Sequence, residues 1–150
     1  RLPGDDVKII NVSSRSFGTV AYDETDQLKL FNIIIKNAEL PATGMNAFYP
    51  RYDNQQSVKF QVMECLASDE KVDPELGKEI GTADLTLPAG VSRDTEIQVT
   101  FRLDESGLLH LHAKEMKGGR EVDAEFQTTE ALSEQEMSDA IRRSNKSSVN

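Results

Sequence analysis

The chain is 150 residues long, enough for one domain with its own core, and its 37% hydrophobic and 29% charged residues are typical of a globular protein. Its net charge of −9 argues against general nucleic-acid binding, which depends on a basic surface. No apolar run approaches the roughly 20 residues of a membrane span, so no membrane is expected as a partner.

The first residues and the one cysteine indicate whether the chain is a fragment and which cellular compartment it occupies. Residues 1–4 include neither Met nor an apolar leader, so the chain is expected to be a fragment of a longer protein, without a secretory signal. Cys65 has no internal disulfide partner, which favours a reducing compartment and a cytoplasmic location. Because no histidine lies in local register with Cys65, we expect a small buried or edge residue and not a nucleophile.

The predicted elements are mostly strands. Residues 5–10 form a short acidic and then apolar segment, which is either a strand or a linker. Strands are then expected at 17–22, 28–36, 45–52, 58–65, 80–87, 96–103, 108–115 and 121–128. Turn-forming residues separate them at 23–26, 41–44, 53–55, 88–90 and 117–119. This spacing predicts a mainly β protein, an antiparallel β-sandwich of about eight strands.

The clearest pattern is a hairpin over residues 97–114. Apolar residues alternate with polar ones along both of its strands, which predicts a half-buried antiparallel pair. The turn between Asp104 and Gly107 suits a type I turn closed by a glycine in the left-handed conformation. The apolar positions are Ile97, Val99, Phe101, Leu103, Leu109, Leu111 and Ala113.

A helix is expected to follow the sandwich. Ser133 and Glu136 form a capping box, and Leu132 and Met137 occupy the positions of a hydrophobic staple. The helix should begin near residue 134 and end near 142 or 143, where two arginines suit a C-terminal end. It resembles the first turns of a longer helical element, followed by a frayed tail.

Residues suited to catalysis are scarce. His110 and His112 share one strand face, but two ligands without a third make a poor zinc site, so we expect solvent-facing residues and no metal. Gly118 and Gly119 read as a hairpin turn, not as a phosphate-binding loop. The chain is therefore not expected to be an enzyme by itself.

Residues suited to binding are more abundant. Tyr22, Tyr49 and Tyr52 all lie in the first third of the chain, at strand ends or beside turns, and Phe48 and Val58 are close in sequence. Aromatic side chains near loop tips often build binding surfaces, because they offer a large contact area at low entropic cost. They also cap the ends of sandwich cores, and the residues alone leave both interpretations open.

Several motifs together resemble the substrate-binding domain of the seventy-kilodalton heat-shock (DnaK-type) chaperones. The resemblance extends from about residue 6 to residue 141, and it rests on the order and spacing of the motifs. These are the 97–114 hairpin with 118–121, Lys36-Asn37 with Leu40-Pro41, the 53–55 turn leading to Val58, and 132–136 at the helix start.

The resemblance implies a division of the chain. Residues 1–10 would be an interdomain linker remnant, in which Val7, Lys8, Ile9 and Ile10 would dock on a neighbouring domain. Residues 11–129 would form the β-sandwich peptide-binding domain, and residues 130–150 the start of a truncated helical lid and its tail. The tail near Val149 is expected to enter the groove of a neighbouring molecule.

The resemblance also implies a peptide site at one end of the sandwich. An extended apolar segment would be held in a groove, with one aliphatic side chain in a central pocket. The residues expected to line the pocket are Thr19, Ile33, Phe48, Val58 and Phe60. The peptide main chain would be held by Gln55 and by backbone around Ala21 and Tyr49, and Tyr22 and Arg51 would arch over it.

The chain also departs from the family pattern and looks like a divergent member. Thr19 stands in place of an aliphatic pocket residue, Arg51 in place of a small arch residue, and Lys8 within a linker that is usually a run of leucines. The segments 23–27 and 66–78 are longer than usual. We expect Arg51 to pack over Tyr22 by a cation–π contact, giving a polar arch that tolerates acidic peptide residues.

The implied partners are unfolded or extended peptides, the nucleotide-binding domain of the parent protein, a J-domain co-chaperone and a nucleotide-exchange factor. No cofactor is expected in this chain, whereas ATP and Mg would bind, and ATP would be hydrolysed, in that separate domain. Two alternatives stay open. One is an adhesive or carbohydrate-binding β-sandwich, and the other is a docking module with a vestigial groove.

Overall fold

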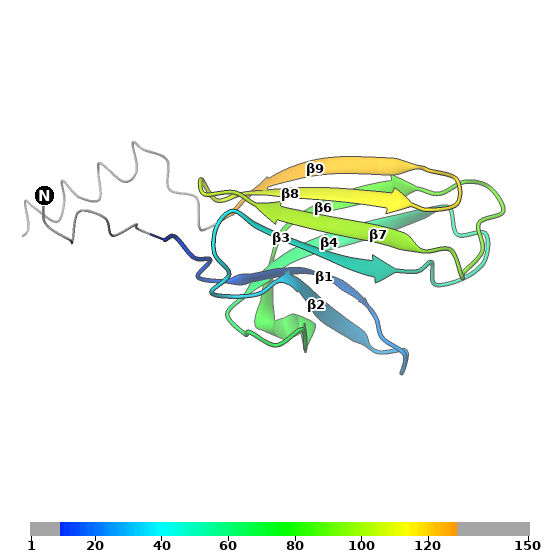
Figure 1. Cartoon of the computed structure of the whole chain (residues 1–150). Coiled ribbons are helices and arrows are strands. Elements are labelled where there is room, and N and C mark those ends of the chain that lie inside the picture. Colours follow the sequence, from blue (N-terminus) through cyan, green and yellow to red (C-terminus); the bar gives the residue numbers. More distant parts are fainter. Residues whose placement is uncertain (1–9, 129–150) are drawn as a thin grey trace, which may run out of the picture.

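Two antiparallel sheets packed face to face make up residues 10–128, the part of the chain that the computed structural model describes (Figure 1). One sheet has five strands in the order β5-β2-β1-β4-β6, and the other has four in the order β3-β7-β8-β9. The strands are β1 Ser16–Tyr22, β2 Leu28–Ile34, β3 Ala42–Phe48, β4 Ser57–Cys65, β5 Lys71–Val72, β6 Gly77–Thr86, β7 Ile97–Leu103, β8 Leu108–Glu115 and β9 Glu121–Gln127. The predicted antiparallel β-sandwich is confirmed.

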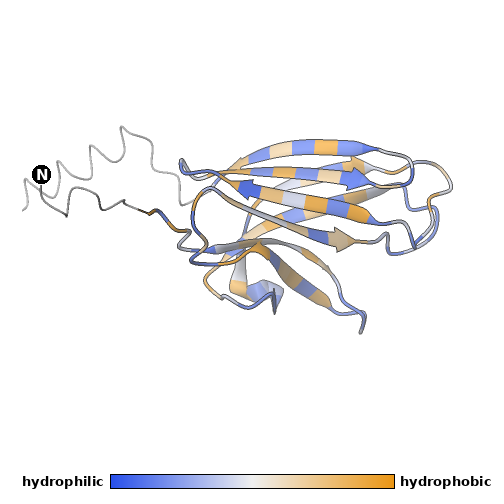
Figure 2. Ribbon diagram, viewed as in Figure 1, coloured by the Kyte–Doolittle hydropathy of each residue, from blue (hydrophilic) through white to orange (hydrophobic). Residues whose placement is uncertain are grey.

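The predicted hairpin forms β7 and β8. Its inward positions Ile97, Val99 and Phe101 are fully buried, while the residues between them face outward, and Figure 2 shows the resulting alternation of colours along β7, β8 and β9. Gly107 has a φ of 84°, and its N–H donates to the carbonyl of Asp104 over 3.1 Å. The expected turn with a left-handed glycine is therefore present.

The main core lies between the two sheets. Phe17 from β1 and Phe60 from β4 meet Phe101 and Leu111 from the other sheet, all of them almost fully buried. Burial of one such side chain contributes about 1.5–3 kcal/mol, so this layer supplies most of the driving force for folding.

A second apolar cluster comprises Leu30, Met63, Cys65 and Val72. Val72 comes from β5, in the 66–78 segment, which also carries a short 3-10 helix at Pro74–Leu76. Cys65 is buried, as expected, and its Sγ lies 3.5 Å from Oδ1 of Asn32.

Some predicted boundaries are wrong. The third strand runs from Ala42 to Phe48 and not over 45–52, so the expected turn at 41–44 is largely strand. Gly44 has a packing role, because a Cβ there would lie 2.2 Å from the carbonyl oxygen of Ile33. The two-residue strand β5 was missed, and β6 begins at Gly77, three residues earlier than expected.

Other expectations fall outside the described residues. These are the linker residues Val7, Lys8 and Ile9, the helix expected from residue 134 and the tail near Val149. The proposed domain boundaries stay predictions. Within residues 10–128 no helix is long and apolar enough to cross a membrane.

Candidate functional site

A groove opens where two neighbouring strands part. β1 pairs with β4 only from Ser16 to Thr19, and Thr19 opposite Val62 is the last pair. Beyond it, β1 continues along β2 as far as Tyr22, while the earlier residues of β4, from Ser57, pair with β6. The backbone edges that β1 and β4 turn toward each other have no ladder partner there among residues 10–128. The resulting groove has a volume of about 1200 Å³ and lies at the end of the sandwich with the β1–β2 and β3–β4 connections (right in Figure 1).

The floor of the groove is apolar and comes from both sheets. Phe31 of β2 and Phe48 of β3 meet edge to face, with ring centroids 5.9 Å apart and an interplanar angle of 79°. Phe60 is buried, while Phe48 and Val58 are half-buried against the main core. Thr19, at 1% exposure, is polar, and the groove lining also includes the polar residues Asn46, Gln61 and Thr82. These side chains give the groove a largely apolar floor.

The three tyrosines form the rim of the groove. Tyr22 is 48% exposed, Tyr49 56% and Tyr52 59%, and all three line the groove. Side chains that capped the core would be buried, so these exposures favour a binding surface over a core cap.

An arch joins the two lips of the groove. The guanidinium carbon of Arg51, from the β3–β4 connection, lies 3.3 Å from the ring centroid of Tyr22, at the end of β1. Its Nη2 also lies 3.0 Å from Oδ1 of Asp26, in the β1–β2 loop. The expected cation–π contact between Arg51 and Tyr22 is confirmed, and the ion pair with Asp26 adds a second tie between the same lips.

Hydrogen bonds fix the β3–β4 connection that carries Arg51. The backbone N–H of Arg51 donates to Oε1 of Gln55 over 2.7 Å, and Nε2 of Gln55 donates to the carbonyl of Ser57 over 2.8 Å. Asn54 adopts a φ of 62°, and its N–H donates to the carbonyl of Val91 over 2.7 Å. Gln55 thus braces its own loop, and its expected contact with a peptide main chain stays a prediction.

The sequence matches a known protein family. The family model described as Hsp70 protein matches residues 3–150. The chain belongs to the Hsp70 family. This relationship links the domain to molecular chaperones, and the sandwich with its end groove is consistent with the substrate-binding region of that family.

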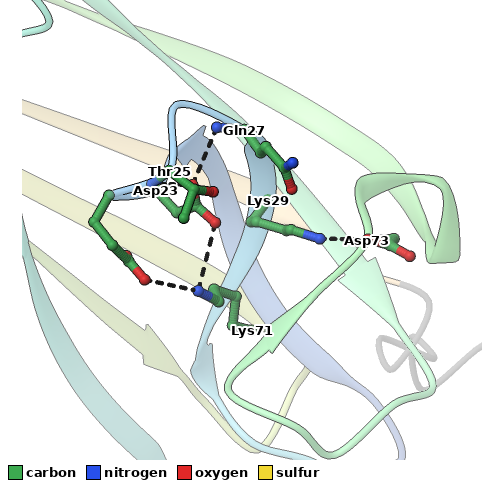
Figure 3. A network of polar contacts seen from close by, with 7 residues as sticks. Asp23, Thr25, Gln27, Lys29, Lys71 and Asp73 are labelled. Atoms are coloured by element: carbon green, nitrogen blue, oxygen red, sulfur yellow. Dashed lines mark hydrogen bonds and ion pairs between the residues drawn. The ribbon is translucent and has the colours of Figure 1, made fainter.

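In this Hsp70-family domain the β1–β2 lip is tied to the 66–78 segment (Figure 3). Nζ of Lys71, in β5, lies 3.5 Å from Oδ2 of Asp23 and 3.5 Å from Oε1 of Glu24. Next to it, Nζ of Lys29 donates to Oδ1 of Asp73 over 2.7 Å. The 66–78 segment therefore supports the lip that holds one side of the arch.

Asp23 organises the turn within that lip. Its Oδ1 accepts from the hydroxyl of Thr25 over 2.6 Å and from the backbone N–H groups of Thr25 and Gln27 over 2.8 and 3.0 Å. These hydrogen bonds, above all the one from the Thr25 side chain, hold the pKa of Asp23 well below its usual range. The side chain is only 3% exposed, so the carboxylate is an integral part of the loop.

The structure brings together nine of the ten residues expected at the peptide site. Ile33 is the exception, because it does not line the groove and packs against the main core. Phe31, two residues earlier on the same strand, lines the groove and was missed. Of the four linker residues only Ile10 is described, and it is 60% exposed. The nine are Thr19, Ala21, Tyr22, Phe48, Tyr49, Arg51, Gln55, Val58 and Phe60.

The histidines are not among the residues that line the groove. His112 of β8 lies 2.7 Å from Asp123 through Nδ1, and Nε2 of His110 lies 3.3 Å from Oδ2 of Asp104. Both side chains are partly exposed on the outer face of their sheet. Within residues 10–128 no three His, Cys, Asp or Glu side chains are placed to hold a metal ion.

Proposed function

We propose that this Hsp70-family domain binds extended segments of unfolded proteins in the groove. The observation that carries the proposal is the parting of β1 from β4 beyond Thr19, which leaves strand edges without partners on either side of an apolar floor. An extended peptide can add its own backbone hydrogen bonds to such edges, and a pocket between them can select one side chain.

The energetics require both parts of the groove. Micromolar affinity corresponds to about 8 kcal/mol, whereas burial of one aliphatic or aromatic side chain contributes only about 1.5–3 kcal/mol. Several backbone hydrogen bonds, at about 0.5–1.5 kcal/mol each, would supply the rest, and the cover given by Arg51 and Tyr22 would slow peptide exchange. The domain would act by binding alone, without a cofactor, and would be coupled through residues 1–10 to an ATP-hydrolysing domain of the parent protein.

Fluorescence anisotropy with a labelled heptapeptide, Arg-Ala-Ala-X-Ala-Ala-Arg, tests the proposal. The arginines suit the acidic protein, and X is the residue meant for the pocket. Val58→Asp places a charge on the groove floor and should weaken binding at least tenfold, because a charge buried without a partner is costly. Leu66→Asp is the matched control, since Leu66 is 64% exposed and lies outside the groove lining, and it should bind like wild type.

Two outcomes would contradict the proposal. If wild type binds neither this peptide nor a reduced and carboxymethylated unfolded protein, the groove is vestigial and the domain is a docking module. If wild type instead binds glycans, and Val58→Asp and Leu66→Asp affect glycan binding alike, the domain is a carbohydrate-binding sandwich.

A further inference from the structure

One hydroxyl on the groove floor has no hydrogen-bond partner among the described residues. Oγ1 of Thr19 is fully buried and makes no hydrogen bond to any residue in the described range 10–128. Most buried polar side-chain atoms in proteins are hydrogen-bonded, so an unpaired hydroxyl calls for an explanation. Thr19 also lines the groove, at the last pair between β1 and β4, where the two strands separate.

The surroundings of Thr19 do not explain the hydroxyl. Its cross-strand partners are Phe31 and Val62, whose side chains cannot form a hydrogen bond with it. The polar groove residues Asn46 and Gln61 form no hydrogen bond with its Oγ1. A valine would have the same shape and would not bury an unpaired oxygen. The hydroxyl is therefore unfavourable in the free protein and becomes favourable only if something in the groove pairs with it.

We propose that the pocket selects a peptide residue that carries a hydroxyl on a small aliphatic body, threonine above all, and that Thr19 is the specificity-determining residue. This inference rests on the proposed peptide-binding function. A threonine hydroxyl can donate to Oγ1 or accept from it, while the threonine methyl contacts the aromatic wall formed by Phe31 and Phe48.

Other polar side chains fit less well. An asparagine would bring two donors and an acceptor, more polar groups than the single hydroxyl of Thr19 can pair. A carboxylate beside Thr19 would be desolvated, so acidic peptide residues are expected under Arg51 and not in this pocket, and a serine would lose the methyl contact. A leucine would fill the pocket but leave the hydroxyl of Thr19 unpaired, as it is in the free protein.

A double-mutant cycle between protein and peptide tests the proposal. The heptapeptide Arg-Ala-Ala-X-Ala-Ala-Arg is titrated with X as threonine or as valine, which have the same shape, against wild type and Thr19→Val. In the ratio of the two affinities, every contribution to binding that threonine and valine share cancels, and the contribution of the threonine hydroxyl remains. The threonine-to-valine affinity ratio should be about 3–10-fold larger for wild type than for Thr19→Val, which is the range expected for one hydrogen bond.

The chain supplies its own controls. Thr95 is also fully buried, and its Oγ1 also has no partner among residues 10–128, but it does not line the groove. Thr95→Val should therefore keep the wild-type ratio, and so should Thr19→Ser, which retains the hydroxyl. Thermal unfolding establishes that each variant is folded.

The outcomes are distinct. A ratio that is the same within twofold in wild type and Thr19→Val overturns the inference while leaving peptide binding intact, and so does an equal shift in Thr95→Val. Failure of both peptides and of the unfolded protein to bind wild type removes the proposed function itself.

Discussion

Replacement of Arg51 by alanine should turn the groove from a gated site into an open one. The Arg51 side chain spans the groove from the β3–β4 connection to Tyr22 and Asp26 on the opposite lip. A peptide bound beneath the Arg51 side chain can leave through the open top of the groove only if these contacts break. Arg51→Ala removes both contacts and should therefore raise the association rate and the dissociation rate together.

The size of the effect follows from the geometry. The Arg51 and Asp26 side chains are 43% and 76% exposed, so their ion pair contributes only about 0.2–1 kcal/mol. A cation–π contact at an exposed site adds about 0.5–1 kcal/mol. A barrier of about 1–2 kcal/mol corresponds to roughly 5–30-fold in both rates, while the affinity changes much less because the two rates move together.

Stopped-flow anisotropy with the labelled heptapeptide measures both rates. Arg93→Ala is the control, because Arg93 also lines the groove and the substitution removes the same charge. Tyr22→Phe keeps the aromatic ring and should leave both rates near those of wild type. Equal dissociation rates for Arg51→Ala and Arg93→Ala, or a change in the association rate of Arg51→Ala alone, would show that Arg51 does not close the groove.

The other predictions concern charge, pH and packing. The Arg51 guanidinium retains N–H donors beyond the one that pairs with Asp26, so a peptide array should show binding of peptides that contain Asp or Glu. Arg51→Ala should weaken the binding of these acidic peptides about 2–5-fold. An unchanged array profile would contradict the polar arch. The pKa of Asp23 lies below the ordinary 3.8, so its ionised form stabilises the fold above about pH 4 and that stabilisation is lost on further acidification. The urea midpoints of wild type and Asp23→Asn should therefore converge from pH 6 to pH 3, whereas a widening gap would reverse the sign. Gly18→Ala would place a Cβ 2.0 Å from the carbonyl oxygen of Phe31 and should cost at least the ~1–3 kcal/mol of an over-packed site. A urea midpoint unchanged from wild type would contradict the close approach.

Much of the fold could be predicted because one face of the β7–β8 hairpin is buried and the other is not. The alternation of apolar and polar residues then shows which side chains face the core, and the inward residues from Ile97 to Leu103 are all fully buried. β2 gives no such signal. Leu30 faces the second cluster and Ile34 the main core, so apolar residues occur on both faces, and the pattern could not show that Phe31 and not Ile33 reaches the groove.

The errors in β3 have a different cause. Pro41 and Gly44 are residues typical of turns, but Gly44 is required by the close approach of Ile33 from the other sheet, a contact that local sequence does not reveal. β5 is only two residues long and exists because it pairs with β2 and buries Val72 on Leu30. Tertiary contacts define both elements.

The site was predicted by resemblance more than by pattern. Family motifs pointed to Thr19, Tyr22 and Arg51, and the structure adds what the motifs could not contain. These additions are the tie from Arg51 to Asp26, the support of the lip by Lys71 and the missing partner of the Thr19 hydroxyl.

The central claim is that extended peptides bind between β1 and the β3–β4 connection. Titration of ¹⁵N-labelled domain with the heptapeptide, followed by amide chemical shifts, tests it most directly. We expect saturable shifts clustered at Thr19 to Tyr22, Tyr49 to Gln55 and Val58 to Phe60, with none at His110 or His112 on the outer face of the other sheet. Shifts confined to that outer face, or none at saturating peptide, would contradict it.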